Sequence, residues 1–152
     1  MKKLFKAIIV CTLILSLFSL TGCGGKEQTA TYKTSSNGVE MKMTFHAVGD
    51  KIDNIHQESI IDTSNYSSSQ IDTLKQTSDS YKSKFAKVNG VTYEMKEESN
   101  SLTEIIDIKL DNENLQELIS SNLLPVTGTN VDYLSFEKTV EQFDSMGWEK
   151  VE

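Results

Sequence analysis

Two histidines, His46 and His56, are side chains in this sequence that could do chemistry, and the chain contains no other histidine. They lie in neighbouring segments that are predicted to pair as strands, with Asp53 and Glu58 close by. Two imidazoles and a carboxylate form a ligand set that suits zinc. The spacing of ten residues matches no zinc motif, however, and the register that decides whether both rings share a face is open. A small envelope metal-handling protein or enzyme using this pair is therefore the alternative hypothesis, and we expect no metal site.

Glutamates form a second group, at the predicted tip of a hairpin: Glu97, Glu98 and Glu104. Opposed carboxylates can raise one pKa or bind calcium, but charged hairpin tips are more often solvated and discourage edge pairing. The run 111–114 lacks the glycine and the later acid of an EF-hand, so helix capping explains it better. We expect neither group to be catalytic.

Apolar side chains offer two further candidates. Met41, Met43 and Phe45 could line a soft ligand pocket or a copper site, but at strand spacing we expect them to pack in the core. Trp148, next to Gly147, could dock a partner, because tryptophan is enriched at interface hot spots. We favour the alternative, in which it covers the end of the last helix.

Composition excludes several classes of function. The chain has 152 residues, which is typical of one domain, and its 15 basic residues, all lysine, against 22 acidic ones give a net charge of -7. An acidic chain without arginine is not expected to bind nucleic acid. The sequence has no Ser-His-Asp spacing, glycine-rich phosphate loop or CxxC motif. We therefore expect a protein that is not an enzyme and binds no cofactor.

The first 22 residues have the pattern of a secretory leader. Lys2, Lys3 and Lys6 precede an uncharged and mostly apolar run over residues 7–20. Fourteen residues in a helix span about 21 Å, which is shorter than the roughly 30 Å core of a bilayer. The run is therefore predicted to be a signal-peptide segment rather than a membrane span.

Cys23 ends this leader in the sequence Leu20-Thr21-Gly22-Cys23, which resembles the lipobox cut by the bacterial lipoprotein signal peptidase. The resemblance implies that Cys23 becomes the first mature residue and carries diacylglycerol as a thioether. Two acyl chains are enough for stable anchoring. Cleavage would remove three lysines and no acid, which shifts the net charge from -7 to -10, and it would remove Cys11, so the mature domain could form no internal disulfide.

The leader also allows a further hypothesis. Its tail, LSLFSLTG, is an apolar octapeptide that resembles the pheromones some bacteria cut from lipoprotein leaders. Most leaders have such tails without signalling, so this stays the weakest of the three functional hypotheses.

The mature chain alternates strand and helix patterns. Residues 24–36 are predicted to be a tether that becomes an entering strand, and residues 39–47 and 52–61 to be strands around the turn Gly49-Asp50. Ser67 begins a helix over about 68–88 with Gln70 in a capping box, and Asn89-Gly90 ends it. Asp111 or Asn112 caps a short helix, and Ser135 caps a last helix that stops at Gly147.

For the second hairpin the sequence favours one register. With Asn100-Ser101 as the turn, Val91 faces Leu110, Tyr93 faces Ile108 and Met95 faces Ile106, which places these residues on one face and Glu97 opposite Glu104. We therefore expect an α+β domain, in the order ββ-α-ββ-α-α, with the helices on one sheet face. This order suggests two copies of a hairpin-plus-helix unit, without a residue-level repeat. The predicted divisions are residues 1–22 as signal peptide, 23–36 as lipidated cysteine and tether or entering strand, and 37–152 as a single domain.

Four stretches together resemble the YehR-like family of small bacterial lipoproteins: LTGCGGKE, NGVEMKMTFHAVGDKI, KVNGVTYEMKEESNSLTEIIDIKLDNENLQEL and SMGWEKVE. The resemblance implies an α+β domain of paired strands and packed helices. The activity of the family is uncharacterised, so Cys23 is the only functional position that carries over.

These observations predict a lipoprotein held by Cys23 on the outer face of the cell membrane, and the absence of arginine with abundant Lys, Asn, Ser and Thr suggests a Gram-positive source. Its expected role is that of a binding or interaction module for an envelope protein or a small ligand.

Overall fold

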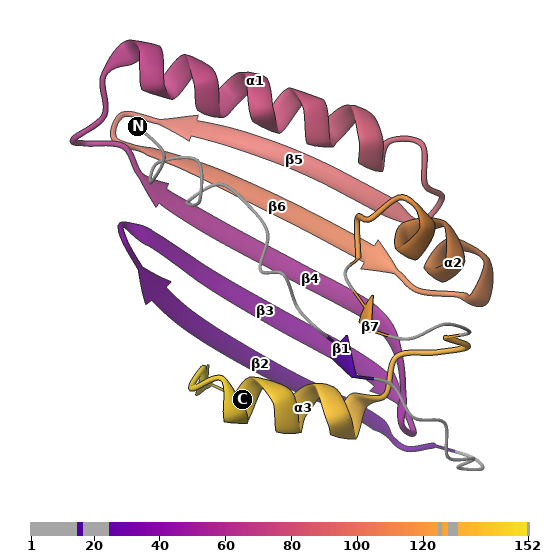
Figure 1. Cartoon of the computed structure of the whole chain (residues 1–152). Coiled ribbons are helices and arrows are strands. Elements are labelled where there is room, and N and C mark those ends of the chain that lie inside the picture. Colours follow the sequence, from indigo (N-terminus) through magenta and orange to yellow (C-terminus); the bar gives the residue numbers. More distant parts are fainter. Residues whose placement is uncertain (1–14, 17–24, 125, 128–130, 152) are drawn as a thin grey trace.

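The computed structural model describes residues 15–16, 25–124, 126–127 and 131–151. Within these residues, a six-stranded antiparallel sheet has the order β5-β6-β4-β3-β2-β8 (Figure 1). Its strands are β2 (Glu27–Ser36), β3 (Val39–Val48), β4 (Lys51–Asp62), β5 (Val91–Glu98), β6 (Ser101–Lys109) and β8 (Glu149–Lys150). The described helices are α1 (Ser68–Phe85), α2 (Asn112–Ser120) and α3 (Phe136–Ser145). The expected α+β class is confirmed.

Strands β2, β3 and β4 form a meander, where the sequence pattern predicts a strand pair with a short entering strand. Strand β2 begins already at Glu27 and pairs along its whole length with β3. Its pattern is weak because few of its residues are apolar, yet Ala30 and Tyr32 are completely buried. The unit before α1 therefore has one strand more than the unit after it.

Two-residue turns connect the long strands. Asn37 and Gly38 both have positive φ angles, 53° and 78°, which a turn with the right-handed twist of a hairpin requires. Gly49, with φ at 63°, begins the predicted Gly49-Asp50 turn between β3 and β4.

The register predicted for the β5–β6 hairpin is wrong by two residues. Glu98 pairs with Ser101, so the turn is Ser99-Asn100, and Val91 faces Ile108, Tyr93 faces Ile106 and Met95 faces Glu104. A shift of two residues leaves every side chain on its predicted face, because the pleat has a period of two. The hydrophobic pattern alone does not distinguish these two registers.

The helix starts follow the capping signals in the sequence. Ser67 and Gln70 form the predicted capping box of α1, Asp111 caps α2 with Asn114, and Ser135 caps α3. Helix α1 ends at Phe85, three residues before the predicted end, and Gly90 takes positive φ in the connection to β5. Gly147, with φ at 75°, stops the last helix as expected.

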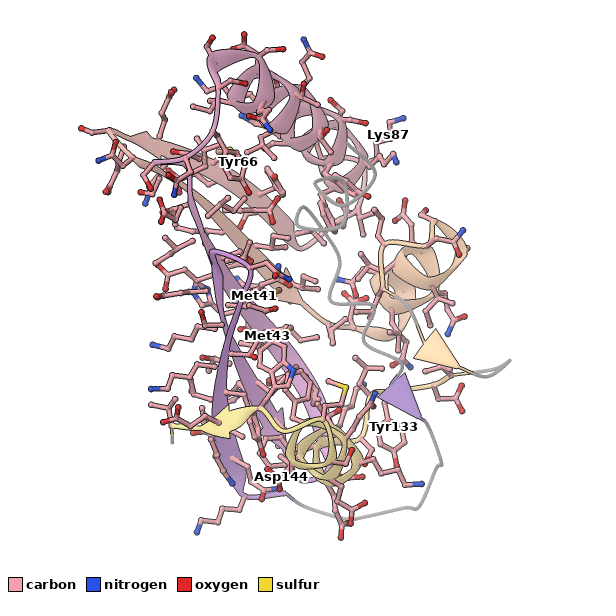
Figure 2. All side chains as sticks on the ribbon, turned by 60° about the vertical axis from the view of Figure 1, so that its left-hand side comes forward. Met41, Met43, Tyr66, Lys87, Tyr133 and Asp144 are labelled. Carbon is pink, nitrogen blue, oxygen red and sulfur yellow. The ribbon has the colours of Figure 1, made fainter. Side chains whose placement is uncertain are left out.

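Helices α1, α2 and α3 pack on the same face of the sheet, as expected, and two clusters of buried apolar side chains lie beneath them (Figure 2). The main cluster includes Phe143 of α3 against Tyr32 and Phe45, with ring centroids 5.1 and 4.9 Å apart. The small cluster, under α1, consists of Val39, Ile61, Leu74 and Leu102 with partly buried neighbours.

A second, two-stranded sheet pairs β1 (Leu15–Ser16) in parallel with β7 (Val126–Thr127). Leu15 and Ser16 belong to the segment that is predicted from the sequence to be a leader. Among the described residues, no helix combines the length and the hydropathy needed to cross a membrane.

Candidate binding surface

The sheet face opposite the helices, here called the open face, carries mostly polar side chains. They are the residues that alternate along each strand with the buried ones, and in the described chain all three helices pack on the other side. The open face of the central strands consists of Thr29, Thr31, Lys33, Glu40, Lys42, Thr44, His46, Asn54, His56, Glu58, Ile60, Thr103, Ile105, Asp107 and Lys109.

A β-bulge positions the first histidine of this face. The register of β3 and β4 shifts between His46 and Ala47, and this shift brings Asp53 beside the imidazole. His46 Nδ1 lies 2.6 Å from Asp53 Oδ1. This hydrogen bond, with the negative charge of Asp53, raises the pKa of His46 above its usual value.

The second histidine pairs across strands. His56 of β4 lies directly opposite Asp107 of β6, and its Nδ1 is 2.6 Å from Asp107 Oδ1. Asp107 could not be foreseen as its partner, because the pairing of β4 with β6 joins segments about fifty residues apart.

The structure resolves the question of the histidines' faces. Thr44 pairs with His56 and His46 pairs with Asn54, so the two imidazoles are diagonal neighbours on the open face. Each is nevertheless engaged by a different aspartate. Among the described residues, no three His, Cys, Asp or Glu side chains gather in a way that could hold a metal ion. The described residues therefore offer no set of ligands that would support the metal-binding hypothesis for His46 and His56.

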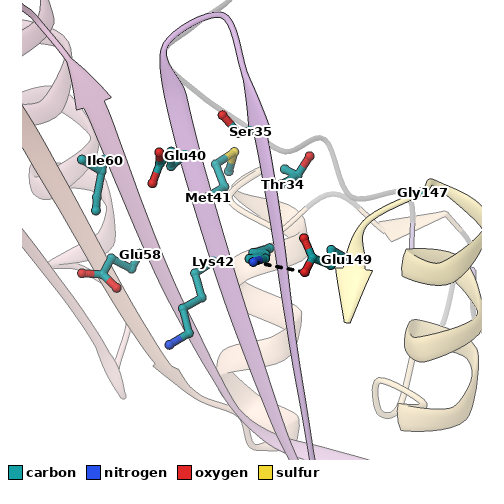
Figure 3. A pocket seen from close by; sticks show the side chains of 10 residues that line it. Thr34, Ser35, Glu40, Met41, Lys42, Glu58, Ile60, Gly147 and Glu149 are labelled. Carbon is teal, nitrogen blue, oxygen red and sulfur yellow. Dashed lines mark ion pairs between the residues drawn. The ribbon is translucent and has the colours of Figure 1, made fainter. Parts of the chain in front are cut away.

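A groove of about 540 Å³ is lined by residues of β4, β3, β2 and β8, which are consecutive in the sheet (Figure 3). Charged side chains of both signs line it, and Lys33 Nζ forms an ion pair with Glu149 at 3.1 Å. Among the lining residues, Lys42 of β3 faces Glu58 of β4, and Glu40 faces Ile60 two residues further along the same strands. No sequence pattern indicated this groove, because β8 has only two residues and its pairing is non-local.

The predicted glutamate cluster does not form. Glu97 faces Leu102 and forms an ion pair with Lys75 of α1, whereas Glu104 points to the helix side, where the Tyr93 hydroxyl donates a hydrogen bond to it. Burial raises the pKa of the Glu104 carboxyl and also that of Tyr93. The two-residue error in register is the reason that Glu97 and Glu104 were expected to be opposite.

The other candidates have structural roles. Met43 and Phe45 are buried in the main cluster, and Met41 packs partly buried against the small one. Trp148 packs edge-on against Phe143, with ring centroids 4.8 Å apart, which matches the favoured role as a cover of the last helix. The Tyr32 hydroxyl donates to Asp144 Oδ1 at 2.9 Å, and burial together with this carboxylate raises the pKa of Tyr32 to about 12.

Two predictions lie outside the described residues. Cys23, the predicted lipidation position, is one, and all but Leu15 and Ser16 of the proposed pheromone octapeptide is the other.

The fold and this surface define a class of small α+β domains in which a main antiparallel sheet has helices on one face and polar side chains on the other. The chain belongs to a family of proteins of unknown function, DUF1307, whose model matches residues 28–149.

Similar proteins from other bacteria are named uncharacterized lipoproteins. The chain is 28% identical to the uncharacterized lipoprotein Lmo0207 of Listeria monocytogenes over 99% of both proteins. It is 28% identical to the uncharacterized lipoprotein YehR of Escherichia coli over 59% of this chain and 56% of that protein. The resemblance to the YehR-like family is thereby confirmed.

Solved structures show the same fold. The NMR structure of E. coli YehR superposes with a TM-score of 0.60 at 20% identity, over 84% of this chain and 93% of that one. An NMR structure of a protein from Streptococcus pneumoniae gives a TM-score of 0.57 at 14% identity, over 89% and 90% of the two chains.

Proposed function

We propose that this protein is a membrane-anchored, extracytoplasmic lipoprotein that acts without catalysis as a binding module for another protein of the cell envelope. The open face of the sheet is its contact surface. The observation that carries this proposal is a six-stranded sheet with helices on one face and, on the other, polar side chains that no described helix covers.

Anchoring at Cys23 is supported by the lipobox-like sequence. It is also supported by a relative that is named a lipoprotein and matches this chain over nearly its whole length. A diacylglycerol group supplies two acyl chains, which is the number that stable membrane attachment requires. The relatives come from Listeria and from E. coli, so the Gram-positive source inferred from composition stays a prediction.

The shape and chemistry of the open face favour a protein partner over a small molecule. Small-molecule sites are usually concave and mostly apolar, whereas the groove at Lys42 and Glu58 is open and lined by charges of both signs. In the described strands the open face carries no Phe, Tyr or Trp, which removes the stacking platforms that single-stranded nucleic acids use. A protein surface with complementary mixed charges fits this face.

Photo-crosslinking in intact cells tests the contact surface. A photoreactive residue is placed at Lys42 on β3 and at Thr103 on β6, both on the open face, and at exposed Gln76 on α1 as the matched control. We expect one adduct of the same size from both open-face positions, lost when Glu58→Lys is added, and no such adduct from Gln76. The same adducts from Gln76, or none from the open face, would contradict the proposal.

Membrane attachment is tested by the substitution Cys23→Ser. We expect the wild-type protein to sediment with membranes after alkaline washing and to carry diacylglycerol on its N-terminal peptide by mass spectrometry. The variant is produced with residues 1–22 replaced by a conventionally cleaved secretory leader, because the apolar run 7–20 would otherwise stay attached. It should then be lost from the membrane fraction, because an acidic globule without acyl chains has no other strong membrane signal. A variant that stays attached would disprove lipid anchoring.

A further inference from the structure

The segment over residues 25–28 is fixed to one end of the sheet. Gly49 N–H donates to the Lys26 carbonyl at 3.0 Å, and Gln28 Nε2 donates to the Gly49 carbonyl at 2.7 Å. Gly25 lies so close to the β3–β4 turn that an added Cβ atom would overlap the backbone of Gly49. The chain between Cys23 and the sheet is therefore not a long free tether.

The same turn is attached to the rest of the domain. Phe136 N–H donates to the Asp50 carbonyl, and Glu137 N–H donates to Asp50 Oδ1, both at 2.8 Å. Ile52 N–H donates to the Leu134 carbonyl at 2.9 Å. Asp50 therefore joins the turn to the first turn of α3, so that Gly25, the β3–β4 turn and the start of α3 form one end of the molecule, here called the proximal end.

From this geometry we infer that the proximal end sits against the lipid headgroups, so that the strands stand upright on the membrane. The inference rests on the proposed lipidation of Cys23. Only Gly24 lies between Cys23 and Gly25, and the two Cα–Cα steps from Cys23 to Gly25 span at most about 7 Å when fully extended. The acyl chains enter the bilayer from Cys23, so the docked Gly25 cannot be far above it.

The chemistry of the two ends agrees with this orientation. At the proximal end Lys26 and Lys51 are exposed beside exposed Glu27, and Val48 is 45% exposed. The two ammonium groups and the apolar side chain suit a headgroup layer. The opposite end carries exposed carboxylates at Asp62, Glu97 and Glu98. This orientation brings the two exposed lysines near anionic headgroups and keeps the carboxylates of the distal end away from them.

The opposite end, here called the distal end, collects the other turns. Asp62 N–H donates to the Gly38 carbonyl, and Thr63 N–H donates to the Asn100 carbonyl, both at 2.8 Å, which joins the β2–β3 turn, the end of β4 and the β5–β6 turn (Figure 1). The twelve residues of β4 separate the two ends by roughly 36 Å. The groove includes Ser35 and Glu40 beside the β2–β3 turn, which lies at the distal end. In this orientation the groove therefore faces away from the bilayer.

Fluorescence quenching by the bilayer tests the orientation. The mature chain has no cysteine besides Cys23, whose sulfur is blocked by the lipid, so Val48→Cys and Asn100→Cys each give one labelling site. The full lipidated protein, with diacylglycerol confirmed by mass spectrometry, is placed in phosphatidylcholine–phosphatidylglycerol vesicles that carry a headgroup-attached quencher. We expect several-fold stronger quenching at position 48 than at position 100.

Two controls separate this inference from the proposed anchoring. A long Gly-Ser insertion between Gly24 and Gly25 should make the quenching of the two labels similar, because the domain would no longer be held close to the lipidated Cys23. Cys23→Ser should abolish quenching at both positions. Equal quenching in the acylated wild-type protein overturns the orientation while anchoring stands. Unchanged vesicle binding by Cys23→Ser overturns the anchoring.

Discussion

The main cluster and the small cluster divide the helix side of the sheet into unequal parts. The main cluster joins all three helices to the proximal half and contains completely buried Tyr32, Phe45 and Phe143. The small cluster has four buried residues beneath the start of α1, in the distal half. Because apolar burial is the dominant favourable contribution to folding, stability should be concentrated in the proximal half. The distal half should be the first to open.

Phe143→Ala should have the largest effect, because it leaves a cavity among three aromatic rings. We expect it to lower the free energy of unfolding by about 3–5 kcal/mol, measured by urea denaturation. Phe143→Leu, which keeps most of the volume, should cost clearly less. If both substitutions cost the same, the site is not packed as described.

Leu74→Ala should destabilise by about 2–3 kcal/mol, at the lower end for a buried leucine, because the small cluster has few members to lose contact. Hydrogen exchange should quicken mainly in α1 and in the distal parts of β5 and β6. Slower exchange in these segments than around Phe143 would show that the small cluster is the more stable of the two. A larger loss of unfolding free energy than that of Phe143→Ala would show the same.

Glu104→Gln should raise the free energy of unfolding at pH 7, by less than Phe143→Ala or Leu74→Ala lowers it. Burial raises the pKa of Glu104 in the folded state, so its favourable contribution is present below the unfolded pKa and is lost as pH rises through the folded pKa. Glutamine is neutral and still accepts from Tyr93. The urea midpoint of the variant should exceed that of the wild type at pH 7, and the gap should close toward pH 4. A lower midpoint at pH 7 would show that the charge is well accommodated.

His46→Gln should have the smallest effect, since its pair with Asp53 is exposed on the open face. The pKa of His46 is raised by Asp53, so the stabilisation is full below the unfolded pKa and fades as pH rises through the folded pKa. The variant should be slightly less stable than the wild type at pH 5.5 and equal to it at pH 8.5. Asp53→Asn should show the same dependence of stability on pH. A loss of stability relative to the wild type that grows as pH rises would contradict this prediction.

Local signals in the sequence predict much of this fold. Each described helix begins at a residue whose side chain accepts from its own first turn, as at Ser67, Asp111 and Ser135, and these contacts span only three residues. The faces of β5 and β6 were also predictable, since side-chain alternation survives a shift of two residues.

Long-range pairing explains what the sequence did not predict. The neighbour of β4 is β6, and the groove needs β8 beside β2, contacts that no local pattern specifies. Strand β2 was only half predicted, because a strand with one face in water can be mostly polar. The surface proposed for binding therefore depends on strand order, whereas the capped helices depend on neighbouring residues.

Strand β5 forms an edge of the sheet and carries exposed Glu94, Lys96, Glu97 and Glu98. With the proposed lipid anchor, copies of the protein would be confined to one two-dimensional leaflet and would meet at high local concentration. Upright molecules related by a rotation about the bilayer normal can bring two such edges together only as parallel strands, with identical glutamates side by side. Parallel pairing is the weaker kind and like charges oppose it, so crowding on the leaflet should leave the copies separate.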